Sequence, residues 1–381
     1  MHNDDRLVAV KRCDGYEMAQ VDKAVEELFA ALHAEELVGP GKRVAIKPNL
    51  LMRRRPDEAT TTHPAVVAAA IKALRRRGVT DLLIAESPSG QYTRARLKSI
   101  YDGCGMTAMA EELKVPLNLD LGVTQTLAPH ARMCREFPIL DPILQADVVV
   151  NVAKLKTHMM TTLSGCVKNL FGCVPGLLKP ELHCRFPDQE DFAGMLIDLC
   201  DLVRPTLSIC DGIVAMEGNG PSGGSPRQLS TLLASRSPYA ADVAACALIG
   251  LAPKQVAMLR EAMNRGLCPS SFEELTIEGD SIESLMQPDF QKAVSQGTDF
   301  LMRVPKVFRG PAKALLTPKP HIRKKDCIGC GRCAESCPKH TIRIADKKAV
   351  IAYSDCIKCY CCHEMCPVKA IDIRRFRLFD L

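Results

Sequence analysis

The sequence predicts an α/β fold, with a mostly parallel sheet and flanking helices, followed by a small C-terminal α+β domain. Short apolar runs alternate with stretches of helical period through the first 300 or so residues, which is typical of βαβ units. Near the C-terminus, two cysteine runs repeat one spacing at an interval of 29 residues. A chain of 381 residues has room for two domains. We therefore expect an α/β domain over 1–302, a basic, proline-containing linker over 303–318, and a second domain over 319–381.

The strands and helices expected in the first domain follow one another in regular alternation. Short runs of β-branched and aliphatic residues indicate strands, which we expect over 7–10, 43–46, 82–86, 147–152, 207–210 and 275–277. Apolar residues at the 3.6-residue period indicate helices, which we expect over 18–38, 62–78, 191–203 and 253–266, with two more starting near 94 and 237. Ligands of such folds bind beyond the carboxyl ends of the strands, so the residues after each strand are the first candidates for a site.

Basic and amide side chains gather after two of these strands. Lys47 and Asn49 follow the second strand, and a longer stretch, 153–172, follows the fourth. Hydroxyl groups and a glycine precede an expected helix in that stretch, and backbone N–H groups at a helix start attract anions. We expect a small anionic ligand to be bound by Lys47, Asn49, Lys154, Lys156, His158, Lys168 and Asn169. A solvated basic helix face is the plainer interpretation of such a charge run, and it stays open.

A glycine-rich stretch, Gly218-x-Gly220-x-x-Gly223, has the letters of a dinucleotide-binding fingerprint. That fingerprint requires a strand before it and a helix directly after it, whereas here an apolar run at 229–234 follows and Pro221 interrupts the stretch. We therefore expect no dinucleotide at this loop. A loop that wraps a ligand or allows a close backbone approach is one interpretation, and a simple wide turn is the other.

The two cysteine runs share the spacing C-x2-C-x2-C-x3-C-P. The first three thiolates of such a run can surround one iron–sulfur cube, whereas the fourth ligates the other cube in two-cluster proteins. We expect two 4Fe-4S clusters, one held by Cys327, Cys330, Cys333 and Cys366, and the other by Cys356, Cys359, Cys362 and Cys337. Two zinc sites are the alternative, but the duplicated x3-C-P element favours clusters. Cys361 lies outside both sets, and we expect a small buried thiol there.

Composition and charge restrict the class of protein further. Nineteen cysteines, in a chain whose N-terminus is polar and acidic, favour a reducing, cytoplasmic location. No apolar run approaches the length of a membrane span, so none is expected. The net charge of +6 is local, since 303–325 carries +8 and the remainder −2, and we expect no nucleic-acid binding. The basic linker could dock an acidic electron-transfer partner, and a merely solvated linker is the alternative.

Five segments together resemble the prokaryotic domain-of-unknown-function family 362. They are Ile46–Leu50, Thr62–Pro64, Asn151–His158, Val167–Gly172 and 211–221. The C-terminal cysteine repeat, over roughly 319–375, resembles the bacterial two-cluster ferredoxin module, which members of that family often carry. The resemblance implies this two-domain architecture and an iron–sulfur redox role. It supplies neither a substrate nor a set of catalytic residues.

Two functions fit these observations. In the first, the ferredoxin module relays electrons to a small anionic substrate or cofactor in the α/β domain, and His158 or His183 supplies protons, because imidazole titrates near neutral pH. In the second, the chain is a non-catalytic electron carrier or adaptor whose α/β domain binds a partner protein. A metal in the large domain is a weaker third idea, with ligands drawn from His63, His158, His183, Asp211 and Glu217.

Overall fold

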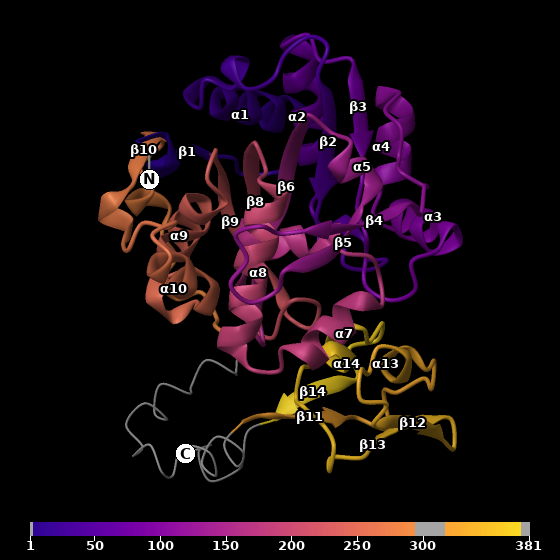
Figure 1. The fold of residues 1–381 in the computed structure, drawn as a ribbon. Coiled ribbons are helices and arrows are strands. Elements are labelled where there is room, and N and C mark those ends of the chain that lie inside the picture. The colour runs from indigo at the N-terminus through magenta and orange to yellow at the C-terminus, as the bar shows by residue number, and fades with distance from the viewer. Residues whose placement is uncertain (1–2, 294–316, 375–381) are drawn as a thin grey trace.

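The computed structural model describes residues 3–293 and 317–374 of the chain. Figure 1 shows a large α/β domain built on a central sheet, with a small domain beneath it that is formed by the C-terminal residues. Of the linker expected over 303–318, all but Thr317 and Pro318 lie outside the described residues. No helix in the described ranges is both long enough and apolar enough to cross a membrane.

The central sheet has eight strands, which lie in the order β10-β1-β9-β8-β6-β2-β3, with β7 paired to β6. Their bounds are β1 (Leu7–Arg12), β2 (Arg43–Pro48), β3 (Asp81–Ile84), β6 (Val148–His158), β7 (Thr162–Ser164), β8 (Leu207–Glu217), β9 (Ser225–Ser235) and β10 (Thr276–Gly279). The β1–β10, β2–β3, β2–β6 and β6–β8 pairs are parallel. The β1–β9, β6–β7 and β8–β9 pairs are antiparallel. The expected mostly parallel sheet is confirmed.

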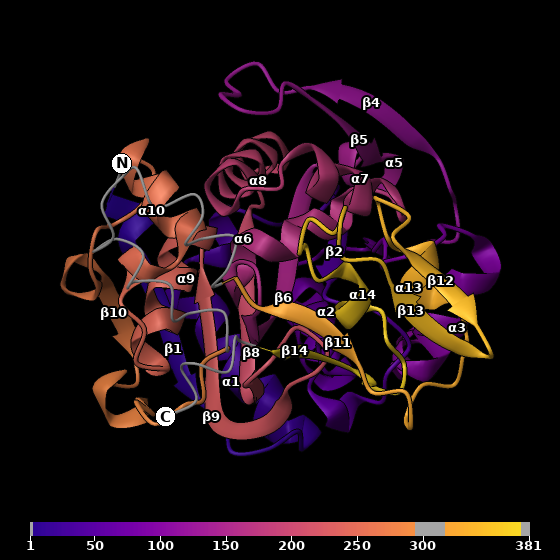
Figure 2. The same ribbon diagram turned by 90° about the horizontal axis from the view of Figure 1, so that it is seen from below.

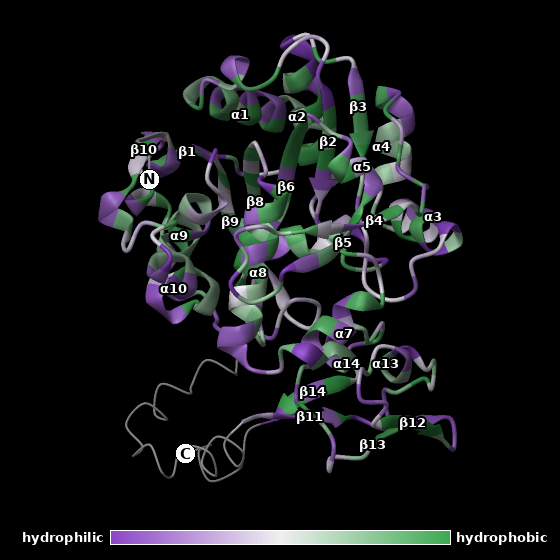
Figure 3. Ribbon diagram, in the orientation of Figure 1, coloured by the Kyte–Doolittle hydropathy of each residue, from purple (hydrophilic) through white to green (hydrophobic). Residues whose placement is uncertain are grey.

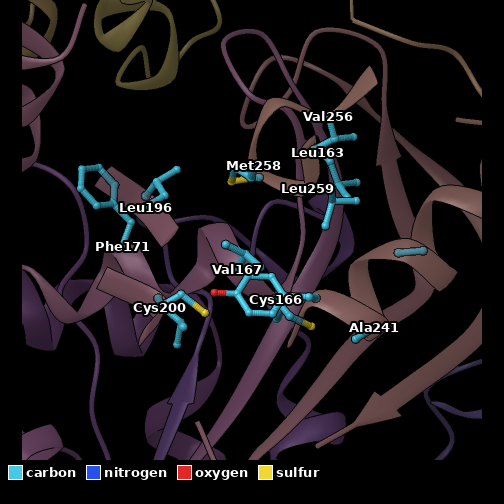
Figure 4. Close-up of a cluster of buried hydrophobic side chains, with 14 of the residues drawn as sticks. Leu163, Cys166, Val167, Phe171, Leu196, Cys200, Ala241, Val256, Met258 and Leu259 are labelled. Atoms are coloured by element: carbon cyan, nitrogen blue, oxygen red, sulfur yellow. The ribbon is translucent and has the colours of Figure 1, made fainter. Parts of the chain in front are cut away.

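Two apolar cores cover the two faces of this sheet. One core is formed with α1 (Met18–Ala31), α2 (Pro64–Arg76), α3 (Arg94–Gly103) and α4 (Met106–Leu113). The other is formed with α6 (Cys166–Asn169), α8 (Gln189–Val203), α9 (Pro238–Leu248) and α10 (Ala257–Asn264). Strand residues alternate between the cores, as in β2, where Val44 and Ile46 face the first and Ala45 the second. Figure 3 shows the apolar central strands, and Figure 4 shows part of the second core, around Val167 and Cys200.

Strand β6 is longer than expected, continuing past Val152 to His158. The extra residues form a ladder because they have partners on both sides. Lys156 pairs with β8, and residues 156–158 pair with β7. An antiparallel hairpin of β4 (Val123–Leu127) and β5 (Glu136–Leu140), followed by the short α5 (Asp141–Leu144), was also not expected. Figure 2 shows this hairpin projecting at one side of the molecule.

The helix expected after β6 starts late and is short. It is α6, and its first N–H groups are already bound, because the carboxylate of Asp242 accepts hydrogen bonds from the N–H groups of Cys166 (2.6 Å) and Val167 (3.1 Å). The expected anion site at this helix start is therefore wrong, since a buried carboxylate from α9 takes its place.

The C-terminal domain consists of two copies of one strand–helix–strand unit. Its elements are β11 (Lys319–Ile322), α13 (Arg332–Glu335), β12 (Ile342–Ala345), β13 (Lys348–Ile351), α14 (Cys361–Glu364) and β14 (Ile371–Arg374). Each element of the first copy recurs 29 residues later, as the sequence repeat requires. The first strand of each copy pairs with the last strand of the other, in the β11–β14 and β12–β13 ladders. The copies are thus interleaved rather than side by side.

Candidate functional site

A cavity of about 70 Å³, partly open to solvent, lies where the C-terminal domain meets the α/β domain. Its walls include residues that follow β2 and β3, the end of β6, and the helix α7 (Leu178–Arg185). β7, α6 and the residues after it, and Pro221 of the glycine-rich loop also line it. The C-terminal domain contributes Ser336, which follows α13, and residues of α14. Figures 1 and 2 show this domain lying across the end of β6, next to α7. The cavity therefore occupies the position at which open α/β sheets bind their ligands.

The end of β6 directs two predicted residues into this cavity and a third one away from it. Lys154, Lys156 and His158 are every second residue of β6, and in a regular strand their side chains would share one face. The pairing of β6 with β8, however, shifts its register between Lys154 and Lys156. Lys156 and His158 line the cavity. The ammonium of Lys154 instead donates to Asp211 Oδ2 and Tyr16 Oη, each at 2.8 Å.

The ammonium of Lys47 is also bound by other side chains of the protein, although it lies close to the cavity. Its ammonium donates to Glu86 Oε2 at 2.6 Å and to Asn169 Oδ1 at 3.3 Å, and both charged side chains are almost fully buried. A Cβ on Gly172 would overlap this ion pair, so the glycine lets the chain pass against it. Lys47 thus holds a wall of the cavity, and Asn169 is itself one of the lining residues.

The hydrogen-bond acceptors of Lys156 are uncharged oxygens of the protein. Its ammonium donates to Asn49 Oδ1 at 2.7 Å and to the carbonyl of Thr60 at 2.8 Å. Burial, followed by the charge of Lys154, lowers the pKa of Lys156 to about 7. At neutral pH this cavity residue therefore exchanges between a charged and a neutral form.

Lys168 has no hydrogen-bond or ion-pair partner among the described residues, and its ammonium lies over the ring of Phe171, 4.5 Å from the centroid. Burial lowers the pKa of Lys168, and the charge of Glu364, across the domain boundary, opposes that shift. Because an ammonium without a carboxylate or carbonyl partner is seldom left in a partly buried place, Lys168 is the strongest candidate for binding an anion here.

Both candidate histidines line the cavity. Nδ1 of His158 accepts hydrogen bonds from the N–H groups of Met160 (3.0 Å) and Thr161 (3.3 Å), so its proton must reside on Nε2. The ring of His183 stacks on Phe192, with centroids 4.2 Å apart. Burial, and then the charge of Lys168, hold the pKa of both histidines well below the ordinary value. Both rings are neutral near pH 7, which differs from the expectation that they titrate there.

Two buried polar atoms at this cavity lack a hydrogen-bond partner in the described part of the chain. They are Nδ1 of His183 and Oε1 of Glu364. Glu364 comes from α14, and its Oε1 lies 3.3 Å from Nε2 of His158 without accepting a hydrogen bond from it. Unsatisfied buried polar groups are rare in folded proteins, and a bound ligand is one of the ordinary reasons for them.

The glycine-rich loop forms one of the contacts between the two domains. The hydroxyl of Ser222 donates to the carbonyl of Glu364 at 2.8 Å, and Lys369 donates to the carbonyl of Gly224 at 3.1 Å. A Cβ on Gly223 would lie 2.5 Å from Cε1 of His363. Of the two interpretations left open for this loop, close backbone approach is therefore the one that the structure supports, and the approaching chain is the C-terminal domain.

The eight predicted cluster ligands line two separate cavities of the C-terminal domain. The first is lined by Cys327, Cys330, Cys333 and Cys366. The second is lined by Cys337, Cys356, Cys359 and Cys362, together with Cys361. Backbone N–H groups donate to three of these sulfurs: Ala349 to Cys327, Thr341 to Cys337 and Ala370 to Cys366. Four thiols around each cavity, some already accepting N–H bonds, fit iron–sulfur clusters.

Comparison with known proteins agrees with this geometry. The family described as "Domain of unknown function (DUF362)" matches residues 44–247, more than half of the chain. The chain belongs to the DUF362 family. A second family, described as "4Fe-4S dicluster domain", matches residues 319–367. The C-terminal domain of this DUF362 protein is thus a 4Fe-4S ferredoxin-type domain.

Two individual proteins are similar to this DUF362 protein. The "Thylakoid-associated protein sll1697" of Synechocystis sp. is 31% identical over 298 residues, which cover 74% of this chain and 89% of the relative. The lactate racemase apoprotein from Thermoanaerobacterium thermosaccharolyticum is 12% identical, with a TM-score of 0.41. That likeness covers 65% of this chain and 58% of the racemase.

The side chains weighed as metal ligands in the DUF362 domain do not form one group: His158 and His183 share the interdomain cavity, whereas the backbone N–H of His63 donates to Asp211 at 3.0 Å elsewhere. His63 stacks on Tyr16, with centroids 3.6 Å apart, and Asp211 is bound by Lys154 and Tyr16. Glu217 accepts from the N–H of Gln291. Within residues 3–293, no three His, Cys, Asp or Glu side chains converge in a way that could hold one metal ion.

Sequence reasoning missed two residues at the DUF362 cavity, Glu364 and Lys179. Glu364 lies between two cysteine ligands, where the motif spacing draws attention to the sulfurs, and its partner His158 is far away in sequence. The ammonium of Lys179 donates to the carbonyls of Ser87 (2.6 Å) and Val174 (2.7 Å), which holds the loop after β3 against α7. The available signal for Lys179 was its place four residues before His183 on one helix, which sets both on the same face.

Proposed function

We propose that this chain is an iron–sulfur reductase that transfers electrons to a small anionic substrate or cofactor bound in the cavity between its two domains. Two 4Fe-4S clusters would be held by the two crossed sets of four cysteines named above, and such clusters supply electrons one at a time, at low potential. One observation carries the proposal: Cys361 lines both the interdomain cavity and the second thiol cavity. Only the thickness of one small side chain separates the ligand cavity from the cluster site.

In this proposal the DUF362 domain binds and orients the anion. Lys168 and Lys156 supply positive charge, and Asn49 and Asn169 supply amide groups, since all four line the cavity. Lys47 and Lys154 were also predicted as ligand-binding residues. Their ammonium groups are already bound by Glu86 and Asp211, so we assign them to support of the walls rather than contact with the ligand.

Proton supply is assigned to a different group from the one expected. His158 and His183 are neutral rings near pH 7, so each can offer a hydrogen bond but not a readily released proton. Lys156, with its pKa lowered to about 7, is the cavity residue that can give up a proton at neutral pH and take it back. We propose Lys156 as the proton donor, with His158 and His183 orienting the substrate.

A reoxidation screen tests this function. The full-length, cluster-loaded protein is reduced chemically without oxygen, and its visible absorbance is followed while fractions of small metabolites are added. We expect an anionic metabolite to reoxidise it, and we expect Lys168→Met to slow that reaction about tenfold or more. The exposed Lys98→Met is the matched control. Reoxidation by protein fractions alone would favour the electron-carrier alternative and contradict the reductase proposal.

We also propose a reducing, cytoplasmic location. The support is the number of thiols, nineteen in all, and the exposure of Cys330 in the first thiol cavity, since such groups are readily oxidised elsewhere. Fractionation of cells under anoxic conditions, followed by immunodetection, checks this proposal.

A further inference from the structure

The first thiol cavity reaches the surface of the C-terminal domain. Cys330 and Ile328, which line it, are both exposed. The second thiol cavity, by contrast, adjoins the interdomain cavity through Cys361. The C-terminal domain therefore has an inner end, which faces the proposed ligand, and an outer end, which faces solvent.

Apolar side chains gather at this outer end. Ile328, Ile344 and Val368 all line the first thiol cavity, and they are 62%, 40% and 40% exposed. The described residues of the C-terminal domain have one further large hydrophobic side chain that is as exposed, Tyr353. Exposed apolar residues scattered singly need no explanation, but three around one cavity mark a contact surface.

Basic residues outnumber the exposed acidic ones, Asp326 and Asp346, around this apolar patch. Lys348 donates to the carbonyl of Cys327 at 2.6 Å, and the backbone of Lys347 packs against Gly329, so both lysines lie at the loop that carries the first two thiols. Lys324 and Lys325 are exposed just before that loop. Over 319–374 the chain has twelve Lys and Arg against six Asp and Glu, which gives the domain a net charge of +6 before any cluster is bound.

We propose that this outer surface, made of Ile328, Ile344, Val368 and the lysines around them, docks a small acidic protein that carries single electrons. The apolar centre would exclude water at the point of contact, and the basic rim would attract and orient an acidic partner. One electron passes per encounter, from the carrier, which is oxidised, to this chain, which is reduced, and no bond forms or breaks. The proposal does not depend on what the interdomain cavity binds. It places the docking surface on the domain itself rather than on the basic linker.

Binding measurements test this surface without relying on turnover. The probe is an acidic plant-type [2Fe–2S] ferredoxin, titrated calorimetrically into the full-length, cluster-loaded protein at about 50 mM and about 300 mM salt. We expect weaker binding at the higher salt, because exposed charges are screened. We expect Ile328→Glu to raise the dissociation constant about tenfold or more, and Lys347→Glu about fivefold.

Two substitutions on the DUF362 domain serve as controls. Leu127→Glu alters an apolar residue that is 68% exposed on β4, and Lys254→Glu reverses an exposed charge remote from the cavity. Each should leave the dissociation constant within about twofold. Because Ile328 is next to a predicted ligand, iron content and visible absorbance are compared for every variant, and Val368→Glu replaces Ile328→Glu if a cluster is lost.

Three outcomes would overturn the proposal. One is equal weakening by the surface variants and their controls, and another is the absence of measurable binding of the acidic ferredoxin at low salt. The third is binding of a basic carrier such as a cytochrome c with the same affinity, since complementary charge would then have no part in recognition.

Discussion

Oε1 of Glu364 lies 3.3 Å from Nε2 of His158, so a side chain of the ferredoxin-type domain completes a cavity of the DUF362 domain. The two residues are 206 positions apart, and no motif connects them. Docking of the C-terminal domain therefore does more than bring the thiol sites close. It adds a carboxyl group to a place where the other domain has gathered lysines, and it makes the lining of this cavity depend on the arrangement of the domains.

Substitution of Glu364 tests its part in that cavity. Burial raises the pKa of Glu364 and the charge of Lys168 opposes this shift, so we compare affinities at about pH 8, where ionisation is favoured. Glu364→Gln removes a charge that repels an anion, and we expect the affinity for the anionic ligand to rise about threefold. The control is Glu335→Gln, which alters the equivalent residue of the first repeat copy, and it should have no effect. A weaker affinity in Glu364→Gln would mean that the carboxylate itself contacts the ligand.

The buried ion pair of Lys47 and Glu86, next to the cavity, is predicted to contribute to the free energy of unfolding. Lys47→Met leaves the Glu86 carboxyl group buried without its cation, and breaking such a pair costs about 3–5 kcal/mol. Chemical denaturation of the two proteins should show a loss of unfolding free energy of that size. The double variant Lys47→Met/Glu86→Gln should recover a good part of it, since no uncompensated charge remains. A single variant as stable as the parent would contradict this account of the pair.

The sheet was largely predictable from the sequence, because most of its strands are short apolar runs that alternate with helices of clear 3.6-residue period. Val44–Ile46 and most of 207–210 are apolar and buried, as expected of parallel strands that are covered by helices on both faces. The end of β6 was not predictable in this way. Lys154, Lys156 and His158 continue a strand although they are polar, because β7 and β8 provide partners for their backbone, and that pairing is a tertiary property.

The site residues also differ in whether local sequence or tertiary contacts determine their position. Local spacing identified the cysteines, because each set is mostly formed within one loop. It also identified the basic residues at the end of β6, but it could not decide which of them face the cavity. The choice between Lys154 and Lys156 depends on a shift of register, and on Asp211 and Tyr16, which are remote in sequence. Crossed ligand sets and crossed strand pairs have one cause, since each repeat copy completes the other.

The close approach at Gly223 predicts a specific weakening of domain docking. Gly223→Ala adds a methyl group that would lie 2.5 Å from the ring of His363, so one of the two must move. We expect faster hydrogen exchange in 219–224 and 361–364, with cluster absorbance unchanged. Gly39→Ala, where a Cβ meets nothing within 4 Å, is the control. Unchanged exchange in Gly223→Ala would show that the interface accommodates the methyl group.

Cys361 is predicted to separate the ligand cavity from the second thiol cavity without holding a cluster. Cys361→Ser should keep the full iron and acid-labile sulfide content, whereas Cys362→Ser, one residue away, should lose about half of both. We further expect Cys361→Ser to change the rate of reoxidation by the anionic substrate, because the side chain lies between the two cavities. Equal iron loss in the two variants would contradict the assignment of ligands in the second run.

The lowered pKa of Lys156 predicts that anion binding weakens as the pH rises. Below about pH 7 the folded protein carries the ammonium and attracts the anion, whereas above it the neutral amine does not. The same shift affects stability, since between about pH 7 and 10.5 the unfolded chain binds a proton that the folded protein has lost, so this residue adds stability as the pH rises through that range. Titration of the anionic ligand from pH 6 to pH 9 should therefore give a dissociation constant that increases through neutral pH. In Lys156→Met the constant should be larger and nearly independent of pH, and an unchanged pH profile in that variant would assign the titration to another group.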